Sequence, residues 1–171
     1  MRRYIAIALF LAACTKTSSP SPAPANTISA SINGTPTTFN VSITVDTLSS
    51  PGTVYVVAHA DSANLTPLFE ITLGNTPLQP GTYPFTSATG SPLPPGSPLP
   101  AGSPFGLLGY TQWSGATDLQ YTPLSDTVTL TTVTKTWFSG TFQGTCEYTV
   151  DSAASIVSIT NGQFTVGYPE H

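Results

Sequence analysis

The chain is poor in positive charge. Its 171 residues include four lysines and arginines together, against eight aspartates and glutamates. Two of the four basic residues are Arg2 and Arg3, so only Lys16 and Lys135 remain in the rest of the chain. Nucleic acids and anionic membrane surfaces are bound through clusters of lysine and arginine. The composition therefore excludes both as partners of the main body of the protein.

A long apolar run is also missing. Tyr4–Leu11 is uncharged and almost wholly apolar, but it is far shorter than the roughly 20 residues that a membrane-spanning helix needs. A basic start, a short apolar centre and small residues after it are typical of a secretory signal peptide. We predict such a peptide over residues 1–13, so any membrane anchor must come from elsewhere.

Cys14 is one of two cysteines in the chain and follows this segment directly. The stretch Leu11-Ala12-Ala13-Cys14 closely resembles the lipobox of bacterial lipoproteins, in which the signal peptide is removed before a cysteine that is then acylated. Several acyl chains hold a protein at a membrane, whereas one chain binds only marginally. By the same resemblance, Thr15 in place of aspartate favours the outer membrane, with its periplasmic or surface side left open. The alternative is an ordinary signal peptide in which Cys14 is incidental.

Two segments are too rich in proline to form strands. Residues 14–27 contain no large apolar residue and alternate small polar residues with proline, which predicts a lipidated cysteine followed by an extended tether. The rest, residues 28–171, is one domain by length. Within it, residues 90–106 contain the near-repeats GSPLPP and GSPLPA and predict an extended loop. We interpret this loop as a duplicated insertion; a docking ligand for aromatic grooves is the alternative.

The remaining sequence is typical of β-strands. Residues 38–45 alternate apolar and polar side chains strictly, and residues 53–60 are apolar on both faces, as in a half-buried and a central strand. No segment has helical periodicity, and the domain is rich in threonine. These patterns predict an all-β fold, an antiparallel β-sandwich or flattened barrel of about nine or ten short strands. Further strands are expected over residues 68–73, 107–113, 128–134, 138–142 and 146–150.

Two Asn-Gly pairs predict hairpins. Asn33-Gly34 lies within a hairpin expected over residues 28–45, with a loop slightly longer than two residues. Asn161-Gly162 predicts a two-residue type I′ turn that would place Ile159 opposite Phe164 on the apolar face.

Four short motifs follow one another along the domain. They are the early Asn-Gly turn, a Pro-Gly-Thr-Tyr turn at 80–83, a Ser-Gly-Thr-Phe strand at 139–142 and a terminal Ile-Thr-Asn-Gly-x-Phe segment at 159–164. This arrangement resembles a family of small all-β bacterial outer-membrane lipoproteins of unknown function. The resemblance covers most of residues 28–168 and implies a fold and a location. It implies no catalytic residues.

Catalytic groups are scarce. His59 lies in an apolar strand and is predicted to be packed, and Cys146 shares its face with apolar residues and is predicted to be a buried structural thiol. Glu70 and Glu147 are expected to face solvent. A hydrolase would need carboxylates brought together from distant strands, such as Asp118 and Glu70. We predict no catalytic site, no metal and no cofactor.

Aromatic side chains are the candidates for ligand binding. Trp137 is predicted to project from the polar side of its strand, where an indole ring can stack on a sugar or a partner surface. Trp113 and Tyr110 share another strand and are the second candidates. The alternative for both tryptophans is that they cap the edge of the sheet or pack under the proline-rich loop.

Four Asp-Ser/Thr pairs resemble the O-glycosylation acceptor pattern of exported proteins in some Gram-negative bacteria. The same pairs also favour turns, which is the other interpretation. The acceptor positions would be Thr47, Ser62, Thr127 and Ser152.

Three classes of function follow from these features. The sequence favours a membrane-anchored, non-catalytic binding or accessory protein of the cell envelope, with a glycan or an envelope protein as its partner. A structural or adhesive surface component is the alternative, and a small hydrolase is the weakest of the three.

Overall fold

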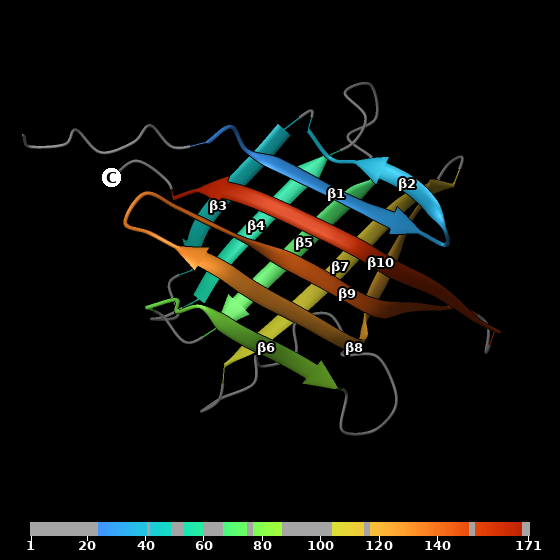
Figure 1. Cartoon of the computed structure of the whole chain (residues 1–171). Coiled ribbons are helices and arrows are strands. Elements are labelled where there is room, and N and C mark those ends of the chain that lie inside the picture. The colour runs from blue at the N-terminus through green and yellow to red at the C-terminus, as the bar shows by residue number, and fades with distance from the viewer. Residues whose placement is uncertain are drawn as a thin grey trace, which may run out of the picture.

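The computed structural model describes residues 24–40, 42–48, 53–59, 67–74, 77–86, 104–114, 117–150 and 153–168 (Figure 1). These residues form ten β-strands and no helix, so no described helix is long and apolar enough to cross a membrane. The strands are β1 (Thr27–Ile32), β2 (Thr35–Thr38), β3 (Ser42–Leu48), β4 (Thr53–His59), β5 (Leu68–Gly74), β6 (Gly81–Thr86), β7 (Phe105–Ser114), β8 (Thr117–Val133), β9 (Trp137–Val150) and β10 (Ala153–Gly167).

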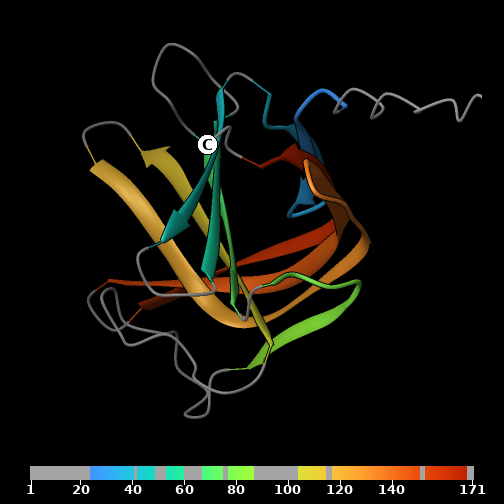
Figure 2. The ribbon, with the colours of Figure 1, turned by 90° about the vertical axis from the view of Figure 1, so that its left-hand side faces the viewer.

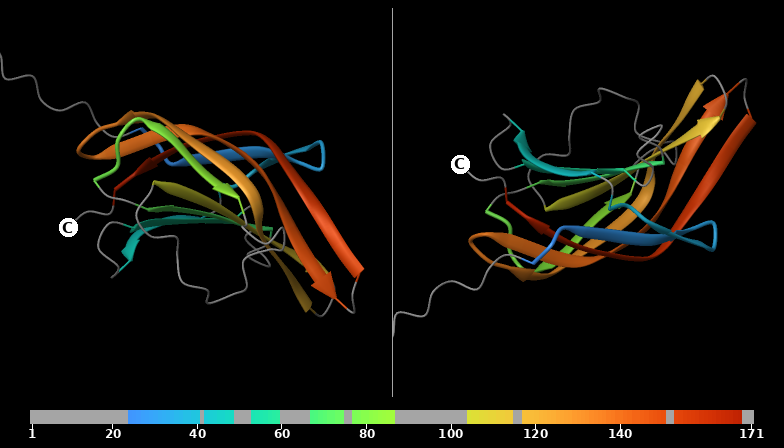
Figure 3. Two further views of the ribbon diagram at one scale, coloured as in Figure 1. Left: turned by 90° about the horizontal axis from the view of Figure 1, so that it is seen from below. Right: turned by 90° about the horizontal axis from the view of Figure 1, so that it is seen from above.

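All strand pairings are antiparallel and join the strands into one curled sheet. The order along the sheet is β2-β1-β10-β9-β8-β7-β5-β4-β3, with β6 paired to β8. Strands β2, β1, β10, β9, β8 and β6 form a layer that we call the front sheet, and β7, β5, β4 and β3 form the back sheet, which also takes in the start of β8 (Figure 1). Figures 2 and 3 show the two layers facing each other. The predicted all-β fold, a sandwich or flattened barrel, is confirmed.

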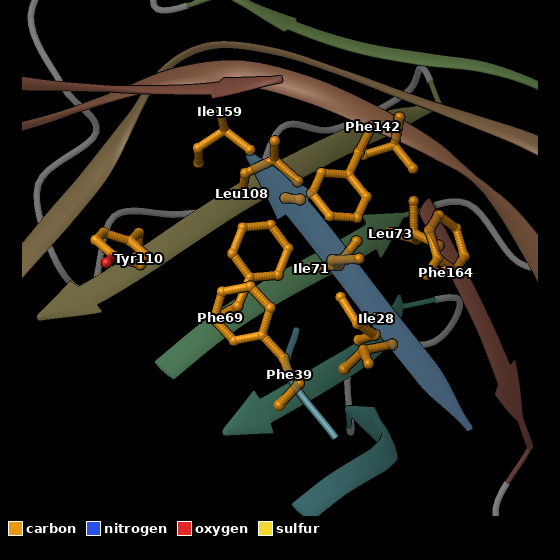
Figure 4. Packing of buried hydrophobic residues seen from close by; sticks show 14 of the residues in the cluster. Ile28, Phe39, Phe69, Ile71, Leu73, Leu108, Tyr110, Phe142, Ile159 and Phe164 are labelled. Atoms are coloured by element: carbon orange, nitrogen blue, oxygen red, sulfur yellow. The ribbon is translucent and has the colours of Figure 1, made fainter. Parts of the chain in front are cut away.

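The core lies between the two layers because each strand turns its apolar residues inward. In the back sheet, Phe69, Ile71 and Leu73 of β5 are completely buried. They meet Phe142 and Phe164 of the front sheet (Figure 4). Ring centroids 5.3 Å apart join Phe39 to Phe69, and centroids 4.7 Å apart join Phe69 to Phe142. Aromatic contacts of this kind therefore tie the two layers together across the core.

Strand β10 contains a β-bulge where the sequence predicts a hairpin turn. It runs unbroken from residue 153 to 167, between β9 and β1, and its register with β9 shifts between Ile159 and Gly162. Asn161 has φ 52°, the left-handed conformation that Asn adopts more readily than most residues. The hairpin prediction is wrong, because the chain continues as one strand past Asn161 and Gly162. The apolar pattern could not distinguish the two structures, since a bulge and a two-residue turn both change which face the following residues occupy. Either one keeps Ile159 and Phe164 on the apolar face.

The other Asn-Gly pair does form a hairpin. Asn33 and Gly34 have φ 49° and 83°, and Ile32 pairs with Thr35, so the loop has two residues and is not longer. The second strand of this hairpin ends at residue 38, whereas the sequence predicted that it would continue to residue 45. The buried Phe39 then donates its N–H to Ile28 O at 2.8 Å, and the chain crosses to the back sheet.

Other strand boundaries also differ from the expected ones. The predicted strands 138–142 and 146–150 form one strand, β9. Gly140 and Gly144 continue its inward side, where a side chain would collide with the Thr129 carbonyl oxygen and with Asp126 Oδ1, respectively. Strand β6 was not predicted. It contains Pro84, which an edge strand tolerates because β6 pairs only with β8. Strand β8 starts earlier than predicted and includes Pro123.

Deleting Asn161 tests the role of the bulge. Removal of this residue takes out the extra residue of the bulge and leaves a regular register with β9 and β1, so Gly162 and Phe164 stay on the inward side and Gln163 stays on the outward side. We expect the deletion variant to keep a cooperative thermal unfolding transition, measured by circular dichroism. The matched control is Asn161→Gly, which keeps the left-handed backbone and should unfold within about 1 kcal/mol of the wild type. A deletion variant without a cooperative transition would contradict this account of β10.

Candidate functional site

The outward face of the front sheet carries a regular array of hydroxyl and amide side chains. Because paired residues of neighbouring strands point to the same side, the register aligns these side chains in rows across the strands. One row crosses all six strands of the front sheet, and its members are exposed or half-buried. In order, they are Thr82, Thr129, Thr141, Gln163, Ser29 and Thr38.

Two shorter rows flank this one. Ser139, Thr165 and Thr27 are aligned on one side, and Ser125, Thr145 and Ser158 on the other. We call the three rows together the hydroxyl face. None of its side chains is charged, and the nearest carboxylate along β9 is Glu147, two residues beyond Thr145. The face therefore offers hydrogen-bond donors and acceptors without a net charge.

The hydroxyl face is hollowed in two places. One open depression of about 310 Å³ lies over β1, β8, β9 and β10, and a second of about 440 Å³ lies over β8, β9 and β10. Thr141 and Gln163 line both, so the depressions adjoin each other at the middle of the long row. Threonine, serine and glutamine make up most of their walls, in contrast to the apolar lining of most small-molecule pockets.

Trp137 begins β9 and lies on the same side of the sheet as Ser139 and Thr141. It is half-buried. A tight turn fixes the backbone of Trp137. In this turn, Thr134 Oγ1 accepts the Trp137 N–H at 3.0 Å and donates to the Trp137 carbonyl oxygen at 2.8 Å. The position of Trp137 at the edge of the hydroxyl face agrees with the predicted outward projection of this residue.

The second pair of aromatic candidates lies differently. Tyr110 is buried in the core (Figure 4), with its ring centroid 5.8 Å from that of Tyr121. Burial, and secondly Tyr121, raises the pKa of the Tyr110 hydroxyl. The structure therefore places Tyr110 among the packing residues and not on a binding surface. Trp113 lies on β7 opposite Asp118, and its side chain is outside the described part of the chain.

Of the candidate modification positions, the structure describes Thr127 and the backbone of Thr47. Thr127 is half-buried on β8, between Pro84 of β6 and Gln143 of β9. Thr47 lies on β3, but its side chain is not among those described. Cys14, Ser62 and Ser152 lie outside the described residues.

The structure does not bring the candidate carboxylates together. Glu70 pairs with Gly109 of β7, whereas Asp118 on β8 pairs with Trp113, four residues farther along β7. Four strand residues span about 13 Å, more than the roughly 5–9.5 Å that separates a glycosidase pair. Among the described residues, no group of three His, Cys, Asp or Glu side chains could hold a metal ion.

One buried polar cluster was missed in the sequence. Asp126 is only 2% exposed, and its Oδ2 accepts the N–H of Leu108 at 3.1 Å. Cys146, buried as predicted, donates its thiol to the carbonyl oxygen of the same Leu108 at 3.3 Å. The alternation could have revealed Asp126, because it shares its parity with Val128 and Leu130, both of which are buried.

Burial controls the protonation of both groups. It raises the pKa of Asp126 to about 7, although hydrogen bonds from the backbone at Leu108 and Thr145 act in the opposite direction. Burial, and secondly the charge of Asp126, raises the pKa of the Cys146 thiol. A buried thiol with a raised pKa is a poor nucleophile, which agrees with a structural role for Cys146.

Comparison with known proteins gives no relatives: the chain matches no protein-family model, no curated protein and no solved structure. The resemblance to small outer-membrane lipoproteins therefore rests on the sequence motifs alone.

The reactivity of Cys146 can be measured directly. We expect a thiol reagent at pH 8 to leave Cys146 unmodified in the folded protein and to modify it fully in denaturant, because the thiol is buried and protonated. Mass spectrometry of the peptide that contains Cys146 separates its reaction from that of Cys14. Rapid labelling of Cys146 without denaturant would contradict the buried cluster.

Proposed function

We propose that this chain is a lipid-anchored, non-catalytic binding protein of the outer membrane, and that its hydroxyl face binds a neutral glycan. The observation that carries the proposal is the row of hydroxyl and amide side chains across all six strands of the front sheet. Sugars present the same kind of groups, which both donate and accept hydrogen bonds. A face without charge suits a glycan without charge, since no ion has to be desolvated on binding.

The shape and the edge of the face support an extended ligand. The two adjoining depressions are open and polar, so they suit a chain of sugars better than a compact apolar molecule. Trp137 at the edge adds an apolar ring surface on which one sugar ring can stack.

The anchoring part of the proposal comes from the sequence. Acylation of Cys14 and the tether over residues 14–27 would lead directly into β1, which belongs to the front sheet. The hydroxyl face would then lie close to the membrane-attached end of the domain. The proposal leaves open which side of the outer membrane the domain occupies.

Strand-edge assembly through the front sheet, one form of the adhesive alternative, has less support. Strands β2 and β6 have unpaired sides and contain Pro36 and Pro84. Proline lacks an N–H and is one of the means by which proteins protect edge strands from pairing. The front sheet is thus poorly suited to adding strands from another copy.

A glycan array with the whole chain tests the binding proposal. We expect selective binding of neutral glycans. Trp137→Ala should weaken it through the loss of ring stacking, and Thr141→Val should weaken it about fivefold, because one hydrogen bond contributes about 1 kcal/mol.

The matched control is Thr44→Val, which makes the same change at an exposed position on β3 of the back sheet. This variant should bind like the wild type. Failure of the folded wild-type chain to bind any neutral glycan would overturn the proposal, as would wild-type binding by both face variants.

A further inference from the structure

Leu108 of β7 pairs with a neighbouring strand on one side only. Strand β7 pairs with β8 from Tyr110 to Ser114. Beyond Tyr110 towards the start of β7, β8 leaves for the front sheet and pairs there with β6 and β9. On its other side, Leu108 pairs with Ile71 of β5, and the residue is completely buried. Its N–H and C=O therefore need partners that neither water nor β8 supplies.

Two side chains of the front sheet supply these partners. The Asp126 carboxyl from β8 accepts the Leu108 N–H, and the Cys146 thiol from β9 donates to the Leu108 C=O. These hydrogen bonds take the place of a strand ladder and join the two layers. We call this junction of Leu108, Asp126 and Cys146 the seam.

Among the described residues, no positively charged side chain lies at the seam to balance the charge of Asp126, and the backbone hydrogen bonds at Leu108 and Thr145 offset its burial only in part. Its Oδ1 has no hydrogen-bond partner among the described residues, and it lies so close to Gly144 that a side chain there would collide with it. The inward titratable side chains on the strands that pack around it are tyrosines and a cysteine, and neither residue type can carry a positive charge. They are Tyr83 of β6, Tyr110 of β7, Tyr121 of β8, and Cys146 and Tyr148 of β9. Glu147 of β9 and Asp118 of β8 lie on the outward side and would add negative charge.

We propose that Asp126 is a proton-operated latch between the two sheets: in its neutral form it holds β7 to the front sheet, and loss of its proton loosens the seam. A neutral carboxyl still offers Oδ2 to the Leu108 N–H. An ionised carboxylate keeps that hydrogen bond, but it leaves a second charged oxygen unpaired in the core, which is costly.

The direction of the pH effect follows from the raised pKa of Asp126, about 7 against 3.8 for the ordinary group. Between these two values the folded protein holds a proton that the unfolded chain has released. Stability therefore falls as pH rises from about 4 to about 7, and Asp126 adds no further change above that range.

The direct test is a carboxyl-carbon NMR titration of Asp126 in the whole chain, combined with hydrogen exchange of the Leu108 amide. We expect the carboxyl to titrate near pH 7. The protection factor of Leu108, corrected for the intrinsic pH dependence of exchange, should fall at least about tenfold from pH 5 to pH 8.

Two variants separate the latch from a merely structural contact. Asp126→Asn keeps an oxygen acceptor and cannot ionise, so its Leu108 protection should not change with pH. Cys146→Ala removes the other hydrogen bond, so it should lower the protection at both pH values and leave the fall with pH intact. An Asp126 that titrates below pH 5, or a Leu108 protection that is the same at pH 5 and pH 8, would overturn the proposal even if Asp126→Asn fails to fold.

Discussion

Most strands of this domain have an apolar face, and a single sheet can bury those faces against each other only by folding back onto itself. Strand β8 makes this possible, because its first residues pair with β7 in the back sheet and its later residues with β9 and β6 in the front sheet. The two layers then share one core, in which Phe69 meets Phe142. The same crossing separates β7 from β8 and leaves Leu108 to be paired by side chains. The seam is thus a direct consequence of the way in which the sheet closes.

The sequence predicts which residues face inward better than it predicts which strands are neighbours. Alternation depends on local geometry, so the inward residues of β5 and β9 follow from the pattern alone. Pairing depends on contacts between distant residues. At Asn161-Gly162 a hairpin and a bulge satisfy the same apolar pattern, and only the pairing of β10 with β1 and β9 decides between them. The agreement in strand number also conceals compensating differences. Strands β9 and β10 each replace two expected strands, whereas β2 and β3 replace one expected strand and β6 was not expected.

In the candidate site, too, local features follow from the sequence and long-range ones do not. The outward position of Trp137 follows from the alternation of a single strand, and the structure agrees with it. The row through Thr129, Thr141 and Gln163 appears only when the two registers of β9 with β8 and β10 are known, because these residues are far apart in the sequence. Tyr110 was misplaced because its strand bears large apolar side chains on both faces, and a second small cluster of Phe85, Phe105 and Leu107 packs on the other side. Composition could not distinguish those two faces.

The position of β1 also determines when the domain can form. The first strand lies between β2 and β10, so the beginning of the front sheet requires the last strand of the chain as its neighbour. Contacts between residues so far apart in sequence slow folding. During synthesis, the front sheet cannot close until residues near 167 have left the ribosome. For a chain exported through an N-terminal signal peptide, this delay would keep the polypeptide unfolded and able to pass through a translocation channel until its end has been made.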